Sequence, residues 1–380
     1  MEQKKMKHIT IISTSFPDAS LKKGQEAAGT FVYDFVYELS QHAKVTIIAP
    51  GSQSKSQEID KLKIQYFSVP SLPLSLLKPT NPTHWFNIIK TLKAGQNMVN
   101  KIVVQEKPDH IFALWALPSG YWAKKAGEKY NTPYSSWALG SDIWSLGKIP
   151  IVRSVLKSVL RGCKHRFADG YILANNVAKI SERDCTFLPS SRKLPVRTVK
   201  KLATHPPYKL AFLGRWHSHK GVDLLLESLT YLEKEDWVKI SEIQICGGGP
   251  LEELVHEEVE KLQNKGLPLT LRGYLNREEA TELLLWADYL LLPSRIESIP
   301  VIFSDAMQAN CPLISTPIGD LPRLLAEEKV GLLAGKITSQ AYAGAIKKAL
   351  KQKPINYDAG LANMRQNFSV EVAVRQFLAL

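Results

Sequence analysis

Strand-like and helix-like segments alternate along this chain of 380 residues. In the first half, apolar runs predict strands at 8–12, 45–49, 64–69, 110–114, 134–138 and 170–174. Between them, segments with helical character lie at 30–41, 84–104, 119–130 and 153–166. Parallel strands need a long crossover connection, usually a helix, so this order is typical of a doubly wound parallel sheet. We therefore predict an α/β fold for residues 1–193.

The alternation restarts in the second half of the chain. Residues 194–207 are rich in Pro and Lys and predict a linker. After it, strands are expected at 208–213, 243–246, 269–272 and 289–292, and helices at 222–231, 251–261 and 277–286. We therefore predict a second Rossmann-like domain over residues 208–360 and a terminal segment over residues 361–380.

The composition is that of a globular protein, with 44% hydrophobic and 22% charged residues. The four cysteines lie far apart at positions 163, 185, 246 and 311, without a CxxC pair, which argues against a disulfide framework and a zinc site. The apolar run near the N-terminus is too short for a signal peptide, and no run approaches the ~20 residues of a membrane-spanning helix. We expect a cytoplasmic protein.

The positive charge is confined to the first half of the sequence. Residues 1–193 contain 27 Lys and Arg against 14 Asp and Glu, a net charge of +13, whereas residues 194–380 contain 22 of each. Such an imbalance predicts an anionic partner for the first domain, either nucleic acid or an anionic membrane surface. A basic surface that only favours solubility is the alternative. No aromatic-rich nucleic-acid motif is present, so we expect no nucleic-acid partner.

Two acids, Glu297 and Asp305, lie eight positions apart in the segment from Pro293 to Pro322. Pro300 between them predicts a helix start, because proline is preferred in the first helical turn. Glu297 would then lie just before a helix N-terminus, where free N–H groups favour a phosphate. Asp305 would lie within the helix beside apolar residues, where an acid needs a partner such as a sugar diol. A solvated loop glutamate and a paired helix aspartate are the alternative.

Arg215 and Lys220 follow the first expected strand of the second domain, after Gly214. Cations at the carboxyl end of such a strand, at a helix start, suit a diphosphate. The guanidinium can bind two oxygens at once, and the ammonium adds a point charge. Two solvated surface cations in a turn are the alternative.

Together these segments resemble the retaining GT-B glycosyltransferases of family 4. The resemblance implies two Rossmann-like domains that face a central cleft, with the last helix crossing back to the first domain. It also implies that Arg215 and Lys220 contact the donor diphosphate, that Glu297 contacts the donor sugar and that Asp305 contacts the nucleotide ribose. Ser298, Ile299 and Pro300 belong to the same donor segment. Asp305 departs from the family pattern, which usually has a longer glutamate there.

Two further segments of the second domain match the resemblance. Gly248 and Gly249 follow a strand and resemble the family's glycine turn toward the donor, although a plain tight turn fits these residues equally well. Arg272 and Tyr274 resemble the segment that lines the nucleotide base. The glycines do not form GxGxxG, which argues against a classical NAD site.

In the first domain, Gly29 precedes an expected helix and resembles the family's glycine loop over the sugar and diphosphate. A helix-start glycine without a ligand is the alternative. Asp142 matches a short family motif and is a candidate acceptor-side group, or alternatively a helix cap. Leu139 stands where the family often has histidine, so no histidine role carries over.

A basic stripe is expected on the helix at 153–166, with an apolar stripe beside it. Its members recur at helical spacing: Arg153, Lys157, Arg161 and Lys164. A core-packed helix with a solvated basic face explains this pattern, and so does contact with a phosphate-bearing acceptor or an anionic membrane. The segment 71–93, which mixes leucines, aromatics, prolines and lysines, is a second membrane candidate, with core packing favoured.

We therefore predict a retaining hexosyltransferase-like enzyme that moves a sugar from a nucleotide-diphosphate sugar to a glycan or lipid-linked acceptor in polysaccharide or cell-envelope synthesis. Arg215, Lys220, Glu297 and Asp142 are the expected catalytic residues. No metal or other cofactor is expected, in line with the absence of an Asp-x-Asp motif. The alternatives are a sugar-nucleotide epimerase or hydrolase of the same fold, and an inactive nucleotide-sugar-binding partner.

Overall fold

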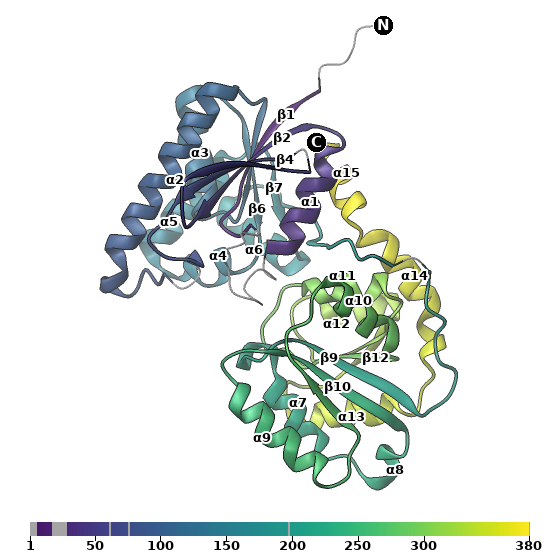
Figure 1. Ribbon diagram of the computed structural model, residues 1–380. Coiled ribbons are helices and arrows are strands. Elements are labelled where there is room, and N and C mark those ends of the chain that lie inside the picture. Colours follow the sequence, from purple (N-terminus) through teal and green to yellow (C-terminus); the bar gives the residue numbers. More distant parts are fainter. Residues whose placement is uncertain (1–5, 17–28, 61, 75–76, 197, 380) are drawn as a thin grey trace, which may run out of the picture. The chain divides into compact units, whose positions relative to one another are not determined.

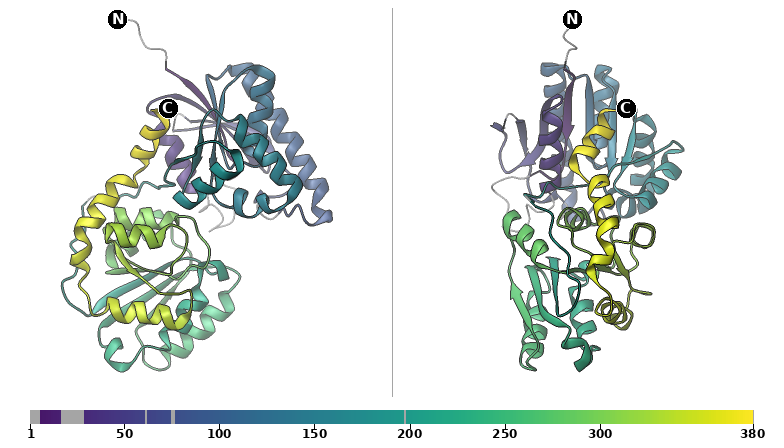
Figure 2. Two further views of the ribbon diagram at one scale, coloured as in Figure 1. Left: turned by 180° about the vertical axis from the view of Figure 1, so that it is seen from behind. Right: turned by 90° about the vertical axis from the view of Figure 1, so that its right-hand side faces the viewer.

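The computed structural model describes residues 6–16, 29–60, 62–74, 77–196 and 198–379. The chain divides into two compact units (Figures 1 and 2). Unit 1 comprises Met1–Ser190 with Ala373–Leu380, and unit 2 comprises Ser191–Val372. Each unit consists of a mostly parallel sheet with helices on both faces.

In the described part of unit 1, eight strands form one sheet in the order β3-β4-β2-β1-β5-β6-β7-β8. Their bounds are β1 His8–Ile12, β2 Lys44–Gly51, β3 Lys55–Ile59, β4 Leu62–Ser68, β5 His110–Leu114, β6 Tyr134–Ala138, β7 Arg166–Ala168 and β8 Thr186–Phe187. All neighbours pair in parallel except β3 and β4, which form an antiparallel edge pair. β3 was not predicted because its side chains are mostly polar and exposed.

The helices of unit 1 include α1 Thr30–Ser40, α2 Trp85–Glu106, α3 Ser119–Tyr130, α4 Ser141–Trp144, α5 Pro150–Gly162 and α6 Tyr171–Ser181. Alternate residues of β5 face opposite layers, as expected for a strand. Ile111 and Ala113 pack in the core under α2, α3 and α5, whereas Phe112 contacts Phe35 of α1 on the other face.

One predicted strand, at 170–174, is wrong. Those residues begin α6, and the strand of this region is β7, a few residues earlier. Gly170, in extended conformation, precedes the helix. The short run Tyr171–Ala174 is apolar enough to suggest a strand, but Leu173 and Ala174 form the buried stripe of a helix together with Val177, one turn further on.

The C-terminal end of the chain forms two helices, α14 Asp358–Asn367 and α15 Val370–Leu378. The residues from Ala373 onward belong to unit 1. There Phe377 stacks on Phe112 with ring centroids 4.3 Å apart and contacts Phe35 and Phe167, each at 5.9 Å. The last turns of the chain thus complete the core of unit 1.

In the described part of unit 2, six parallel strands form one sheet in the order β11-β10-β9-β12-β13-β14. The strands are β9 Tyr208–Arg215, β10 Ile240–Gly248, β11 Leu269–Arg272, β12 Tyr289–Leu292, β13 Leu313–Ser315 and β14 Gly331–Leu333. The helices include α7 Val222–Leu229, α8 Lys234–Trp237, α9 Glu252–Gln263, α10 Arg277–Trp286, α11 Val301–Gln308, α12 Leu321–Glu328 and α13 Ser339–Ala349. The chain proceeds from β9 toward β11 and then returns to β12 on the other side of β9.

That return makes the boundary between β9 and β12 a topological switch point. In open α/β sheets, the connections after the two strands at such a point diverge, and ligands bind outside their carboxyl ends. The loops after β9 and β12 are therefore the expected ligand-binding loops of unit 2. They carry Lys220 and Glu297, respectively.

The segment predicted as a linker, 194–207, is packed into unit 2. The ammonium of Lys200 donates to the Ala287 carbonyl, and Asn310 Nδ2 donates to the Lys200 carbonyl at 2.9 Å. Leu202 is buried, and the Ile355 amide donates to the Ala203 carbonyl. The Pro- and Lys-rich composition predicted a linker, but the carbonyls of Lys200 and Ala203 accept hydrogen bonds from side-chain and backbone groups of unit 2.

Candidate active site

Lys220 and Glu297 form an ion pair at the switch point of unit 2. Lys220 ends a short 3₁₀ helix, η5 Ser218–Lys220, in the connection between β9 and α7. Glu297 lies in the loop between β12 and α11. The two side chains retain 38% and 18% of their exposure, so an anionic ligand could reach the ammonium. The structure thus brings together two of the predicted catalytic residues.

Gly221, directly after Lys220, lets the two loops approach each other. Its φ of +72° is unfavourable for residues with a side chain. A Cβ built at this position would lie 2.0 Å from the carbonyl oxygen of Pro293, the residue that follows β12. The close backbone contact holds Lys220 beside the loop that carries Glu297.

Arg295 joins the same two loops and was not predicted from the sequence. Its guanidinium donates to both carboxylate oxygens of Asp223, at 2.8 and 2.9 Å, and to the Ser218 carbonyl at 2.6 Å. Its backbone amide donates to the His219 carbonyl at 2.8 Å. Bidentate pairing of this kind fixes geometry as well as energy. The position of Arg295 two residues before Glu297 was the available signal.

The loop that carries Glu297 also rests on the residues after β13. Gly319 has a φ of +47°, and a Cβ there would lie 2.0 Å from the Ser298 carbonyl oxygen. Among the described residues, the buried Ser298 hydroxyl has no hydrogen-bond partner. Ile299 is buried, and Pro300 occupies the N-cap position of α11 with a φ of −61°. The backbone N–H groups at the start of α11 and the unpaired Ser298 hydroxyl can both donate hydrogen bonds, which suits an oxygen-rich ligand.

Asp305 has no access to solvent. It lies on α11, and its carboxylate forms an ion pair with the guanidinium of Arg192, whose Nε lies 3.2 Å from Oδ1. The sequence alternative of a paired helix aspartate describes this geometry. A contact between Asp305 and a ribose would require the pair with Arg192 to open.

A hollow of about 520 Å³ lies at the carboxyl ends of β10 and β11. Its walls include Trp216, Gly248, Glu252, His256, Arg272 and Tyr274. A Cβ on Gly248 would lie 2.6 Å from the Tyr274 ring, so the glycine is needed for this contact. The indole N–H of Trp216, a residue only 1% exposed, has no partner among the described residues. An unpaired buried donor beside a hollow is a candidate ligand contact.

The remaining predicted donor residues lie at the ends of β9 and β10. Gly214 and Arg215 end β9 and pair in register with Gly247 and Gly248. The Arg215 side chain is exposed. Gly249, with a φ of +144°, lies against the Trp216 carbonyl, where a Cβ would be 2.8 Å away.

Two predicted site residues, Gly29 and Asp142, lie in unit 1. Gly29 is the N-cap of α1, and the loop before it lies outside the described residues. Asp142 is 1% exposed, and its carboxylate accepts from the amides of Ala116 at 2.6 Å and Leu139 at 3.3 Å. Burial raises the pKa of Asp142 to about 6. The carboxylate thus binds loop amides rather than capping α4, whose N-cap is Gly140 without a side-chain cap bond, and an acceptor-side role of Asp142 stays a prediction.

Of the basic stripe expected on residues 153–166, Arg153, Lys157 and Arg161 lie on α5, whereas Lys164 follows its end at Gly162. Much of the stripe is paired. Lys157 and Arg161 both form ion pairs with Glu182, and Arg153 donates to the Gly147 carbonyl. These contacts neutralise part of the stripe.

In the described ranges, no helix combines the length and apolar character needed to cross a bilayer. Within the same ranges, no group of three or more His, Cys, Asp or Glu is placed to hold a metal ion.

The fold as a whole matches solved structures over nearly its full length. Sucrose-phosphate synthase from Thermosynechococcus elongatus matches with a TM-score of 0.72 at 16% identity, covering 98% of both chains. The Anabaena protein HepE in complex with UDP matches with a TM-score of 0.71 at 13% identity, covering 98% of this chain and 99% of that one. The protein therefore has the two-domain α/β fold of the GT-B class, as predicted.

Residues 207–352 match the family Glycosyl transferases group 1. The chain thus has the GT-B fold, and most of its second unit is similar to the glycosyl transferases group 1 family, in agreement with the resemblance carried by Glu297, Arg215 and Lys220.

Curated relatives match at lower coverage. A D-inositol 3-phosphate glycosyltransferase of Corynebacterium aurimucosum is 26% identical over 50% of this chain and 47% of its own length. A putative teichuronic acid biosynthesis glycosyltransferase of Bacillus subtilis is 26% identical over 63% of this chain and 60% of its own. The chain spans about half the length of the curated relatives it matches.

Proposed function

We propose that this protein is a retaining, metal-independent glycosyltransferase of family 4. It transfers a hexose from a nucleotide-diphosphate sugar to a glycan or lipid-linked acceptor in polysaccharide or cell-envelope synthesis, on the cytoplasmic side of a membrane. The observation that carries the proposal is the Lys220–Glu297 ion pair, which joins the loops after β9 and β12 at the switch point of unit 2. Glycosyltransferase relatives and a UDP-bound solved structure of the same fold support the donor class.

In this reaction the bond between the sugar and the diphosphate breaks, and the diphosphate leaves with the bonding electrons. An acceptor hydroxyl forms the new glycosidic bond and loses its proton. The cations Lys220 and Arg215 would stabilise the charge that develops on the leaving diphosphate. Glu297, paired with Lys220 before the donor binds, would accept hydrogen bonds from the sugar hydroxyls, with Ser298 beside it.

The nucleotide would occupy the hollow lined by Gly248, Arg272 and Tyr274, at the carboxyl ends of β10 and β11. The unpaired N–H of Trp216 supplies a donor there. The ribose would be held by groups other than a free Asp305, because that carboxylate is engaged by Arg192.

A two-stage experiment tests this function. A thermal-shift screen of nucleotide sugars finds the donor, since a ligand that binds the native state raises Tm. Release of nucleoside diphosphate and transfer of labelled sugar are then measured with a membrane-glycan fraction as acceptor. Lys220→Ala and Glu297→Ala should each lower transfer by at least about 100-fold while leaving the unfolding transition in place.

The matched control removes another lysine from an ion pair of unit 2. Lys347 pairs with Glu233 at 2.7 Å, next to α8. Because α8 leads into β10, this pair lies at the amino end of that strand, whereas the site lies at the carboxyl ends. Lys347→Ala should keep full transfer. Full activity of both site variants would refute the assignment, and release of free sugar without transfer would identify a hydrolase instead.

A further inference from the structure

The start of α2 exposes three large apolar side chains in unit 1. Trp85, Phe86 and Ile89 are 55%, 66% and 51% exposed. On a helix with 100° per residue they lie within one 100° arc, so they form one patch, which we call the α2 tip. Apolar groups clustered in this way differ from the single exposed apolar residues that every protein surface carries.

Trp85 is held in place although its ring is exposed. Its indole Nε1 donates to the Pro79 carbonyl at 2.8 Å. The preceding residue, His84, accepts from the Lys78 amide at 2.9 Å through Nδ1. Because the polar N–H is already satisfied by the protein, the exposed part of the ring is apolar. The chain therefore fixes a large apolar group in an outward position. Exposing such a group to water is unfavourable, so a basic surface that only favours solubility does not explain it.

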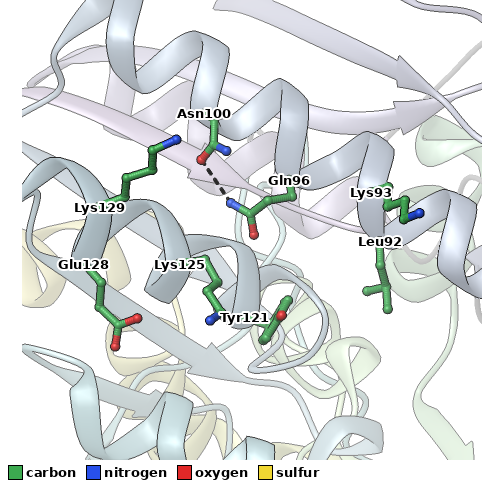
Figure 3. A pocket seen from close by; sticks show the side chains of 8 residues that line it. All are labelled: Leu92, Lys93, Gln96, Asn100, Tyr121, Lys125, Glu128 and Lys129. Atoms are coloured by element: carbon green, nitrogen blue, oxygen red, sulfur yellow. Dashed lines mark hydrogen bonds between the residues drawn. The ribbon is translucent and has the colours of Figure 1, made fainter.

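Lysines follow the α2 tip along the same surface. Lys90 lies with its ammonium 4.4 Å from the Phe86 ring centroid, and Lys93 lies one turn beyond Ile89 on the same helix face. Lys93 also lines a groove of about 600 Å³ between α2 and α3, together with Lys125 and Lys129 (Figure 3). Within the described part of the chain, none of these four lysines is ion-paired, in contrast to Lys157 and Arg161 of α5.

An apolar tip backed by unpaired lysines is the pattern of a protein that enters a bilayer interface. Apolar and aromatic groups enter the headgroup–acyl boundary, and lysines behind them contact anionic headgroups. The charge of unit 1 complements such a surface, since it contains 26 Lys and Arg against 14 Asp and Glu, a net charge of +12. Nucleic acid would use the lysines but gives no reason to expose Ile89.

We propose that the α2 tip and the α2–α3 groove form the surface through which this protein docks on an anionic phospholipid bilayer. Trp85, Phe86 and Ile89 enter the interface, while Lys90, Lys93 and Lys125 contact the headgroups. The proposal rests on the proposed function for its purpose, because a lipid-linked acceptor would be presented at such a surface. It moves the membrane contact away from α5, where the sequence placed its first candidate.

The test is co-sedimentation of the full chain with vesicles of phosphatidylcholine containing 30% phosphatidylglycerol. Replacing Trp85, Phe86 and Ile89 by serine should lower the partition coefficient on the order of 100-fold, from partial burial of three apolar side chains. Lys90→Ala and Lys93→Ala should each lower it about fivefold, and added salt should weaken binding further. Phe86→Ser with Ile89→Ser keeps the hydrogen bond of Trp85 and guards against a local folding defect.

Two controls define the surface. Val104 is 52% exposed on α2 but far from the tip, so Val104→Ser should bind as the parent does. Lys157→Ala with Arg161→Ala on α5 should also retain binding. Equal loss in the Val104 variant would overturn docking by the tip, and loss only in the α5 variant would place the contact there. Unchanged binding of the serine variants would refute the proposal.

Depth of insertion gives an independent readout. All eight tryptophans lie in the described part of the chain, and Trp85 is the exposed one. Brominated lipids should therefore quench part of the fluorescence, and Trp85→Phe should remove that quenching. The transfer-deficient Glu297→Ala variant should bind vesicles normally, so failure of docking and failure of the proposed reaction are separate results.

Discussion

Arg192 and Asp305 form a buried ion pair across 113 positions of the sequence, between the first residues of unit 2 and the middle of α11. One turn further along α11, Gln308 accepts from the Leu194 amide at 3.0 Å and donates to the Arg192 carbonyl at 2.6 Å. The helix that begins after the Glu297 loop therefore holds the chain segment that follows Ser190. Asp305 serves unit 2 as the charged partner of that segment.

The pair gives the first prediction. Arg192→Ala leaves the Asp305 carboxylate buried without its partner, which should cost about 3–5 kcal/mol of unfolding free energy. Chemical denaturation measures the loss. Replacing both residues at once, Arg192→Met with Asp305→Leu, should restore most of the stability, because two apolar side chains need no partner.

The control is Lys193→Ala, at the neighbouring position. Lys193 pairs with Glu371 at the surface, at 2.8 Å, and an exposed pair contributes at most about 1 kcal/mol. If Arg192→Ala were as mild as Lys193→Ala, the buried pair would not support unit 2.

The sequence predicted the parts of the site that depend on local order. Apolar runs placed β9 and β12, and the residue types after them marked Lys220 and Glu297 before their contact was known. It did not predict the pairing of Arg192 with Asp305, because a distant partner leaves no trace in local spacing. It also did not predict Arg295, because a single arginine in a loop is common and only the fold brings it to Asp223.

Alanine substitutions at three glycines of unit 2 can distinguish the cost of a positive φ from the cost of a steric clash. Gly221 combines a φ of +72° with a Pro293 carbonyl 2.0 Å from any added Cβ. Gly221→Ala should therefore cost well over ~1 kcal/mol and lower transfer, because the loops that carry Lys220 and Glu297 must separate. Thermal unfolding and transfer rates measure the two effects.

Matched variants isolate the causes. Gly266 has a φ of +76° with open space around it, so Gly266→Ala should cost only about 1 kcal/mol, the backbone term. Gly344 lies inside α13 with nothing near its Cβ, so Gly344→Ala should be neutral or stabilising by up to ~1 kcal/mol. A loss at Gly221 no larger than at Gly266 would show that the Pro293 contact does not matter.

His110 predicts a pH dependence of stability in unit 1. Burial, with the nearby charges of Lys164, His165 and Lys7, lowers its pKa from 6.5 to about 4. Between these pH values the unfolded chain binds a proton that the folded chain does not. Stability should therefore fall as pH drops from about 6.5 to 4, by roughly 3 kcal/mol from this residue. His110→Gln should flatten that part of the profile in urea denaturation, and an unchanged slope would assign the acid sensitivity to other groups.

We expect the packing of Phe377 to anchor the C-terminal turns of the chain in unit 1. Its ring contacts Phe112, Phe35 and Phe167 and is 7% exposed, so Phe377→Ala removes a large core side chain. The expected cost is about 3–5 kcal/mol, with faster proteolysis near the C-terminus. Gln376→Ala, at the exposed neighbouring position, should change neither quantity. Because Phe112 lies in the central strand β5, a mild effect of Phe377→Ala would mean that the sheet of unit 1 closes its core without α15.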